Sequence, residues 1–477
     1  MRLSDLIAAA SIWLATHVTA DNFTSQVDEI LSRPTFADAT VGVKVTELGS
    51  GEVIYTTQEQ APLIPASNQK LLMSTVALAK LGLDFTYETT VFGSRPIDKK
   101  GVLNGDLWIV GSGDPSLNSD RLASVAESLV AKGLKKITGK VYADGTIFDD
   151  KFLGEGWDPD DEPFYYSAQV AGLNCDLNVV KVNVAPGASV GDPAVVRISG
   201  VPEAEERYVD IQSTVKTIAS GGQESVVFDR TLGTNTIILG GSIPQGAGSV
   251  TLTVTIDNPN AFTAYRLAVA LSNAGVKVSR TPTKPGKLPR KSTHLASSTS
   301  EPVSSLLKLF LKPSDNMYGE ALLKKVGREA DPSRPGTAAS GANVVKTYLA
   351  EENIDATGVK TIDGSGLSDL NTVTARFIND LLIHNKNTFS EAEWSAWFDA
   401  LPIAGVDGTL ASRLVGTPAA GHIHAKTGSL SGVSSLSGYL DAADGTEYVF
   451  SILMNGFTST TEARQAQDDI ALALYLR

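Results

Sequence analysis

Alternating apolar and polar residues near the start of the chain predict a β-hairpin followed by a helix. Residues 39–58 (ATVGVKVTELGSGEVIYTTQ) form two alternating runs on either side of the turn sequence Gly49-Ser50-Gly51. After a proline-containing turn, a stretch rich in Leu, Met and Ala begins at Ser67 and stops at Gly82. A glycine just past an apolar stretch is typical of a helix end, so we expect a helix over residues 67–81.

The middle of the chain changes from a mixed pattern to a mainly β pattern. Residues 101–115 and 137–148 are strand-like and enclose an amphipathic stretch at 120–133, which predicts a helix. From 177 to 257, Val, Ile and Thr alternate with polar residues between glycine turns, as in a series of short strands. Residues 279–302 are rich in Pro, Lys, Ser and Thr and have the composition of a linker or an exposed loop.

The last third of the chain is first helical and then mainly β. Several stretches have helical periodicity, and they are followed by strand-like runs and a final helix. The expected helices are 303–312, 316–330, 337–353, 373–386 and 460–475, and the expected strands are 422–427, 434–440 and 447–455.

These elements indicate an α/β (α+β) chain in which one domain is split by a long insertion. Neither the first hairpin nor the C-terminal strands can close a core alone, so we expect one sheet built from 39–58 and 422–455. The split domain would comprise residues 21–90 and 291–477. Residues 91–290 would form a mainly β insertion of two small nested domains, since an insertion at a surface loop costs little conformational free energy.

The N-terminus has the pattern of a signal peptide over residues 1–20. An apolar stretch at 6–20 follows Arg2 and is too short to span a bilayer as a mature helix. It ends in Val18-Thr19-Ala20, where small or branched residues suit cleavage after Ala20. No later run of about 18 apolar residues predicts a transmembrane anchor. We therefore expect a secreted or periplasmic protein.

The composition restricts the function classes. The 477 residues carry 40 Lys and Arg against 53 Asp and Glu, a formal net charge of −13. With no Lys/Arg-rich run, the chain is a poor match for nucleic acid or anionic membranes. The single cysteine, Cys175, excludes an intrachain disulfide and a cysteine-rich metal site. With five scattered histidines, we expect no metal, no cofactor and no histidine-dependent mechanism.

Three short motifs could combine a serine nucleophile with a lysine base. Ser67-Asn68-Gln69-Lys70 opens the first predicted helix, Ser314-Asp315-Asn316 precedes another, and Lys426-Thr427-Gly428-Ser429 ends a strand-like run. The i,i+3 spacing places Ser67 and Lys70 on one helix face. A serine hydroxyl is a weak nucleophile unless a base removes its proton, and burial lowers the pKa of a lysine toward that of such a base.

Order and context distinguish these motifs from chance occurrences. S-x-x-K also occurs at Ser213 and Ser305, and S-x-N also occurs at Ser116, whereas K-T-G occurs once. Taken singly, such a serine and lysine are usually solvated residues on a helix. Only Ser67 opens a long apolar helix directly after a hairpin, so the ordered triple is much more specific than its parts.

The ordered triple resembles the set found in penicillin-binding proteins and class A β-lactamases. Further segments are similar to the class C low-molecular-mass penicillin-binding proteins, the D-alanyl-D-alanine carboxypeptidase/endopeptidase family. These segments are NGDLWIVGSGDPSL (104–117), DGSGLS (363–368), LPIAGVDGTLASR (401–413) and AKTGSLSGVSSLSGYL (425–440). The interval between Ser67 and Ser314 is far longer than in class A β-lactamases, whereas this family carries extra domains there.

The resemblance implies a penicillin-binding/β-lactamase-type transpeptidase domain, an antiparallel sheet flanked by helices, with inserted mainly β accessory domains. Ser67 would attack the D-Ala-D-Ala peptide bond and Lys70 would act as the base in acylation. Three further residues would have these roles: Ser314 relays a proton to the leaving amine, Asn316 holds the substrate and steadies Lys70, and Lys426 anchors the terminal carboxylate. Thr427, Gly428 and Ser429 would bind substrate beside Lys426, and the N–H groups of Ser67 and Ser429 would form the oxyanion hole.

A second match concerns the side chain of the substrate. Residues 157–160 (WDPD) and 165–169 (YYSAQ) resemble the family segment that receives the stem-peptide side chain. The resemblance implies these positions: Trp157 and Tyr165 as aromatic walls, Leu367 and Leu430 as apolar walls, and Asp160 as the partner of a free ammonium such as that of diaminopimelate. The other interpretation of this segment is an acidic surface loop with core aromatics.

Together these features predict a serine-type D-Ala-D-Ala carboxypeptidase that hydrolyses peptidoglycan stem peptides through an acyl-enzyme on Ser67 and is acylated by β-lactams. The balance between carboxypeptidase and endopeptidase activity stays open. Two alternatives use the same site, namely a D-specific amidase or esterase and a β-lactamase. A third is a penicillin-binding sensor without turnover. Nothing in the sequence indicates an oligomeric state.

Overall fold

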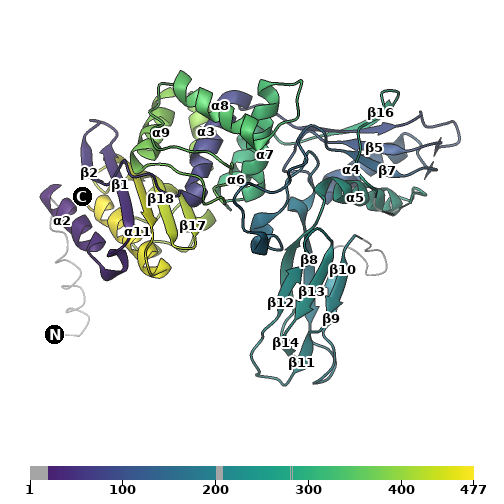
Figure 1. Cartoon of the computed structure of the whole chain (residues 1–477), viewed down its shortest axis with the longest axis horizontal. Coiled ribbons are helices and arrows are strands. Elements are labelled where there is room, and N and C mark those ends of the chain that lie inside the picture. The colour runs from purple at the N-terminus through teal and green to yellow at the C-terminus, as the bar shows by residue number, and fades with distance from the viewer. Residues whose placement is uncertain (1–19, 200–207, 280, 282) are drawn as a thin grey trace, which may run out of the picture.

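The computed structural model describes residues 20–199, 208–279, 281 and 283–477. Apart from Ala20, the expected signal peptide lies outside the described residues. Figure 1 shows a sheet with helices at one end of the molecule, an inserted α/β part at the other end, and a β part that projects from the insertion. Within the ranges just given, no helix has both the length and the apolar character needed to cross a bilayer.

The five-stranded central sheet joins the two ends of the chain. Its order is β17-β18-β19-β1-β2, and every neighbouring pair is antiparallel. The strands are β1 (Thr40–Glu47), β2 (Val53–Thr57), β17 (Ile423–Leu430), β18 (Val433–Asp441) and β19 (Glu447–Asn455). The pairing of β1 with β19 confirms the prediction of one sheet from 39–58 and 422–455. β18 and β19 are buried along almost their whole length, because helices cover both faces of the sheet.

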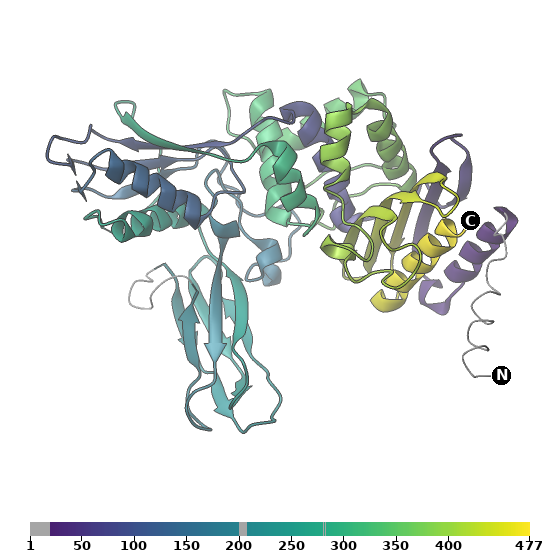
Figure 2. The same ribbon diagram turned by 180° about the vertical axis from the view of Figure 1, so that it is seen from behind.

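Helices form a layer on each face of the central sheet. α2 (Ala20–Leu31) and α11 (Thr460–Tyr475) share a core with one face of the sheet, and Figure 2 shows the two helices side by side there. α3 (Gln69–Leu81) and α9 (Ala375–Thr388) pack on the other face. Outside them lie α6 (Val303–Leu311), α7 (Asn316–Ala330), α8 (Ala338–Glu351) and α10 (Glu391–Phe398). The helices α2 and α10 were not expected from the sequence pattern.

The inserted α/β part is built on a second sheet, in the order β16-β3-β5-β7. Its strands are β3 (Glu88–Gly93), β5 (Leu107–Val110), β7 (Val141–Asp144) and β16 (Thr293–Thr299), and the short strands β4 (Val102–Leu103) and β6 (Lys136–Ile137) pair beside it. The helices α4 (Ser119–Ala131) and α5 (Pro259–Asn273) pack against each other and against this sheet.

β3 leads into the insertion and β16 leads out of it, and the two strands pair antiparallel. The boundaries expected at residues 90 and 291 therefore fall within or next to one pair of strands. The expectation of a linker or loop over 279–302 is wrong for 293–299. That stretch has a loop-like composition, but pairing with β3 makes it a strand.

The β part confirms the mainly β pattern of residues 177–257. It consists of three small sheets, with orders β15-β8-β9, β10-β13-β12 and β11-β14. The strands are β8 (Val179–Ala185), β9 (Val195–Ile198), β10 (Asp210–Ser213), β11 (Lys216–Ile218), β12 (Val227–Arg230), β13 (Thr236–Gly240), β14 (Ser242–Pro244) and β15 (Val250–Thr255). One continuous hydrophobic core runs from Leu129 and Leu267 in the α/β part to Val182 and Val254 in the β part.

Candidate active site

Ser67 lies at the N-terminal end of α3, where the first sheet meets the helical layer. It belongs to a short 3-10 helix, η2 (Ala66–Asn68), and regular α-helix begins only at Gln69, two residues later than predicted. The side chain of Ser67 is partly exposed, whereas the residues that follow it in α3 are buried. The end of a helix adds positive potential next to this hydroxyl.

The side chain of Lys70 is fully buried and donates three hydrogen bonds. Its Nζ lies 2.9 Å from Ser67 Oγ, 2.6 Å from Asn316 Oδ1 and 2.6 Å from the carbonyl oxygen of Ser365. Burial lowers the pKa of Lys70 to about 8, although nearby carboxylates, Asp363 foremost, act in the opposite direction. A buried lysine with this pKa can lose its proton near neutral pH and accept the proton of Ser67.

The carbonyl of Ser365 is held by a buried acidic turn that the sequence analysis did not assign to the site. Glu320 Oε1 accepts the N–H groups of Gly364, at 3.0 Å, and of Ser365, at 2.8 Å. Burial, and then the charge of Asp363, raise the pKa of Glu320 to about 8. Asp363 is itself fully buried and accepts the N–H of Gly366 at 2.8 Å. These contacts fix the direction in which the Ser365 carbonyl points toward Lys70.

A second serine–lysine pair lies beside the first. Ser314, between α6 and α7, has a φ of +63°, a conformation that is uncommon for a residue with a Cβ atom. Lys426 is fully buried on β17 and donates to Ser314 Oγ at 2.8 Å and to the Thr427 carbonyl oxygen at 2.8 Å. Burial, and then the neighbouring charge of Lys70, hold the pKa of Lys426 well below its usual range.

Asn316 connects this site to the inserted region. Its Oδ1 accepts from Lys70, and its Nδ2 donates to the carbonyl oxygen of Tyr166 at 2.7 Å. Because each end of the amide has a complementary partner, the Tyr166 carbonyl keeps the oxygen of Asn316 directed at Lys70. The structure thus brings together all five candidate catalytic residues and adds two backbone carbonyls, those of Ser365 and Tyr166.

Strand β17 approaches Ser67 closely at Gly428. A Cβ atom on this glycine would lie 2.1 Å from Ser435 Oγ, 2.7 Å from the Pro65 carbonyl oxygen and 2.9 Å from the Ser67 backbone nitrogen. Such distances leave no space for any side chain, so only glycine lets the edge strand run beside the nucleophile.

Polar residues that the sequence analysis missed contact β17 on either side of Gly428. Thr427 Oγ1 lies 2.6 Å from Thr409 Oγ1, in the 3-10 helix η6 (Gly408–Leu410). Arg464 of α11 donates to Ser429 Oγ at 3.2 Å, and Ser429 is exposed. Leu430, the last residue of β17, is partly exposed. The exposed edge of this strand therefore carries hydroxyl groups next to a buried ammonium.

The predicted side-chain pocket lies on a segment that precedes the β part. Trp157 is 9% exposed and donates from Nε1 to Asp363 Oδ2 at 2.9 Å, so it packs on the acidic turn behind Lys70. Asp160, in η3 (Pro159–Asp161), is exposed. Tyr165, in η4 (Tyr165–Ser167), is 64% exposed, and Leu367 is partly exposed.

A buried ion pair ties this segment to the β part. Arg230 of β12 is fully buried, and its Nη2 lies 2.6 Å from Glu162 Oε1. The hydroxyl of Thr255 donates to the Glu162 carbonyl oxygen at 2.5 Å. Glu162 lies four residues before Tyr166, whose carbonyl orients Asn316. The inserted region therefore supports one wall of the site from behind.

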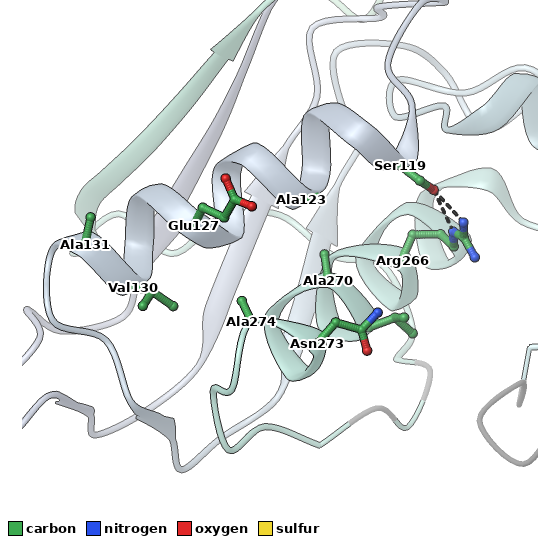
Figure 3. A pocket seen from close by; sticks show the side chains of 10 residues that line it. Ser119, Ala123, Glu127, Val130, Ala131, Arg266, Ala270, Asn273 and Ala274 are labelled. Atoms are coloured by element: carbon green, nitrogen blue, oxygen red, sulfur yellow. Dashed lines mark hydrogen bonds between the residues drawn. The ribbon is translucent and has the colours of Figure 1, made fainter. Parts of the chain in front are cut away.

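A groove of about 550 Å³ between α4 and α5 lies outside this site. Figure 3 shows its lining, which consists mostly of small apolar side chains with Glu127, Asn273, Ser119 and Arg266 among them. Arg266 pairs with Asp176 at 3.2 Å and donates to Ser119 Oγ at 3.0 Å. Its lining residues do not include a lysine, so the groove offers no second serine–lysine pair.

The fold and the site together define the class of protein, a serine-type carboxypeptidase with a penicillin-binding fold. The chain matches the D-Ala-D-Ala carboxypeptidase 3 (S13) family over residues 23–475, and it belongs to that family. This confirms the resemblance found in the sequence. It also makes the chain an enzyme, so the sensor alternative is wrong.

Individual relatives agree with this assignment. The chain is 37% identical to a D-alanyl-D-alanine carboxypeptidase of Actinomadura sp. (strain R39), over 94% of this chain and 83% of the relative. It is 28% identical to the D-alanyl-D-alanine carboxypeptidase DacB of Haemophilus influenzae, over 88% and 86% of the two chains. The crystal structure of penicillin binding protein 4 (dacB) from Haemophilus influenzae is similar, with a TM-score of 0.80 at 25% identity, and covers 94% of this chain and 99% of that one.

Proposed function

We propose that this carboxypeptidase cleaves the D-Ala-D-Ala bond of peptidoglycan stem peptides, with Ser67 as nucleophile and Lys70 as base. The observation that carries the proposal is the 2.9 Å contact between Lys70 Nζ and Ser67 Oγ. The lysine is fully buried, and its pKa is lowered to about 8. A neutral amine in this position is the base that a serine nucleophile requires.

The reaction proceeds in two steps. The neutral amine of Lys70 takes the hydroxyl proton as Ser67 Oγ bonds to the carbonyl carbon of the penultimate D-alanine. The C–N bond then breaks, the proton held by Lys70 reaches the departing amine through the hydroxyl of Ser314, and D-alanine leaves. A water molecule next attacks the ester on Ser67, which releases the shortened peptide as a carboxylic acid and restores the serine hydroxyl.

Lys426 and β17 bind the end of the substrate. The ammonium of Lys426, which contacts Ser314 Oγ, attracts the terminal carboxylate, and the hydroxyls of Thr427 and Ser429 donate to it. The backbone N–H groups of Ser67 and Ser429 stabilise the oxyanion, because the close approach at Gly428 places β17 beside the nucleophile.

The segment 157–167 receives the side chain of the stem peptide. The exposed carboxylate of Asp160 pairs with a cationic side chain, and the exposed ring of Tyr165 lies in the same segment. Trp157, Leu367 and Leu430 complete the apolar wall. The preference for a free ammonium comes from Asp160 and is independent of the chemistry at Ser67.

β-Lactams acylate the same serine, because they present a reactive amide and a carboxylate in the arrangement of the D-Ala-D-Ala end. The apolar N-terminal stretch supports export to the periplasm or the medium, where such peptides occur. We propose carboxypeptidase activity as the main activity. Endopeptidase activity follows if the part of the site that holds the leaving amine accepts a longer amine.

Covalent labelling tests this proposal. The full chain is incubated with labelled benzylpenicillin, and the modified peptide is sequenced; we expect one label, on Ser67. The variant Ser67→Ala should lose the label and the release of D-alanine from a diacetyl-Lys-D-Ala-D-Ala tripeptide. Ser305→Ala is the matched control, because Ser305 lies in a second S-x-x-K sequence, on α6. A label on any other residue would contradict the proposal, and rapid turnover of the drug would indicate a β-lactamase.

A further inference from the structure

The tip of the inserted α/β part brings together three stretches that are far apart in the sequence. These are residues 95–100, 132–140 and 277–291. The N–H of Lys135 donates to the Gly101 carbonyl oxygen at 2.8 Å, and the N–H of Ile137 donates to the Lys277 carbonyl oxygen at 2.9 Å. Further along the third stretch, Thr283 Oγ1 donates to the Val141 carbonyl oxygen at 2.6 Å. Figure 1 and Figure 2 show this tip at the end of the molecule opposite the central sheet.

The three stretches are strongly basic. Within the described residues they carry a single carboxylate, Asp98, while every basic side chain is exposed. No ion pair joins these basic side chains to a carboxylate in the part of the chain that the structure describes. We call this surface the basic end; it consists of Arg95, Lys99, Lys100, Lys132, Lys135, Lys136, Lys140, Lys277, Lys284, Lys287, Arg290 and Lys291.

Two charges of the basic end, those of Lys136 and Lys277, are close enough to reinforce one another. Lys136 and Lys277 face each other in a parallel β-bridge, and Val102, next to the first stretch, pairs with Lys136 on the other side. Neighbouring strands lie about 4.8 Å apart, which is less than the Debye length of about 8 Å at physiological salt. Unpaired ammonium groups at this spacing repel one another, and an anionic partner relieves that repulsion as it binds.

We propose that the basic end binds a flexible polyanion whose charges are phosphodiester groups. Lysines predominate in it, and an ammonium binds a phosphate oxygen as a compact point charge. The side chains are all exposed, so they spread over a surface and suit an extended chain better than a small anion. Because a phosphodiester stays ionised at all physiological pH values, such a chain remains charged along its whole length.

The types of side chain exposed on the basic end narrow the choice among the polyanions that it could bind. In the described residues of the three stretches, no large apolar side chain is exposed. A surface that inserts into a bilayer carries exposed apolar residues, and a surface that binds single-stranded nucleic acid carries exposed aromatic residues for base stacking. The basic end offers ammonium and guanidinium groups without exposed large apolar side chains in its described residues, which favours a soluble phosphodiester polymer.

The test is a binding measurement with the full chain and a synthetic poly(glycerol phosphate). The triple variant Lys135→Glu/Lys136→Glu/Lys277→Glu should weaken binding by about 10-fold or more, and raising the salt from about 50 to about 200 mM should weaken the unmodified chain several-fold. The matched control is Lys308→Glu/Lys346→Glu/Lys360→Glu, which changes the net charge equally at three exposed lysines outside the insertion. This control should bind within about two-fold of the unmodified chain, and both triples should release D-alanine from the soluble tripeptide at the normal rate.

Several outcomes would overturn the proposal. Equal losses in the two triples would mean that binding follows net charge alone. Tighter binding to phosphatidylglycerol vesicles or to duplex DNA would identify a membrane or a nucleic acid instead, and equal binding to polyglutamate would remove the preference for phosphate. If the first triple unfolds at a lower temperature than the unmodified chain, Lys284→Glu/Lys287→Glu takes its place, and unchanged binding by that variant contradicts the proposal. The measurement does not involve Ser67, so its result is independent of the proposed catalytic mechanism.

Discussion

Lysine side chains have opposite surroundings in the helix-flanked sheet region and in the tip of the insertion. In the first region, Lys70 and Lys426 are fully buried, and every hydrogen bond they donate has a defined acceptor. At the tip, Lys135, Lys136 and Lys277 are exposed, and none of them pairs with a carboxylate among the residues that the structure describes. The same side chain is a candidate base where water is excluded and a simple positive charge where water surrounds it, because desolvation disfavours the ammonium.

Lys70 also affects the protonation of Lys426. The charge of Lys70 is the second cause, after burial, of the lowered pKa of Lys426. Two cations buried side by side cannot both keep their protons as readily as two exposed ones. A substrate carboxylate beside Lys426 would favour its protonated form again, because an opposite charge raises the pKa of an ammonium.

The largest expected effect comes from replacing one buried lysine and, in a separate variant, one exposed lysine. Lys70→Met should lower the rate of penicillin acylation by about 10³- to 10⁴-fold, because the base is lost while an apolar side chain fills the space. Lys135→Met should acylate at the unmodified rate. Stopped-flow acylation kinetics measure both, with circular dichroism as the folding control. An unchanged rate in Lys70→Met would mean that another group removes the proton of Ser67.

Arg230 is a buried cation in the insertion. Its replacement therefore shows whether the difference between the buried and the exposed lysines depends on burial or on the region of the molecule. Arg230→Met leaves Glu162 without a cation and should lower the free energy of unfolding by about 3–5 kcal/mol. Urea unfolding measures this loss. KM for a tripeptide with a free side-chain amine should rise more than kcat falls, because the segment that carries Asp160 loosens. Arg376→Met is the control: Arg376 is partly exposed and pairs with Asp355 and Asp380, and its loss should cost about 1 kcal/mol or less.

The pH dependence of the reaction tests the burial of Lys70 directly. In the proposed mechanism the active form carries a neutral Lys70, so kcat/KM should rise with pH and level off above a pKa of about 8. Below that pH the neutral fraction, and with it kcat/KM, should fall about tenfold per pH unit. A profile of kcat/KM measured from about pH 5.5 to 9.5 shows the pH at which this rise ends. A rise that ends only near the ordinary pKa of an exposed lysine would contradict the role of desolvation.

Asp160 gives the smallest expected effect, because it is exposed. Asp160→Ala should raise KM about 2- to 5-fold for a tripeptide with a free side-chain amine, the range expected when one exposed ion pair is lost. The acetylated tripeptide, which lacks this charge, is the control and should keep its KM. Steady-state release of D-alanine measures both substrates. An equal change for the two peptides would remove the acidic side-chain pocket from the proposal.

Strong local periodicity explains which elements could be predicted. The hairpin at 39–58 and the helix over most of 67–81 have regular apolar spacing, and both are present. The stretch 293–299 has a loop-like composition, yet it pairs with β3 in a register that local sequence does not encode. α10 was missed, although Ser390 and Glu393 form a capping box at its start.

The parts of the candidate site that consist of side chains in short motifs could be predicted from the sequence. The structure places Lys70 Nζ against Ser67 and Asn316, and Lys426 Nζ against Ser314. The carbonyls of Ser365 and Tyr166 could not be predicted, since any residue type supplies a carbonyl. Glu320 could have drawn attention as a carboxylate on the buried face of α7, but its partners lie in a turn more than one helix away in the sequence.

The sequence by itself determined the three motifs, the local spacing that puts Ser67 and Lys70 on one turn, and the strands from both ends of the chain that complete one sheet. These follow from patterns within a few residues. Tertiary structure alone decided the burial that lowers the pKa of Lys70 and the assembly of the basic end in a chain with a net charge of −13. Desolvation and Coulomb interactions depend on distances between residues that are remote in sequence, and only folding sets those distances.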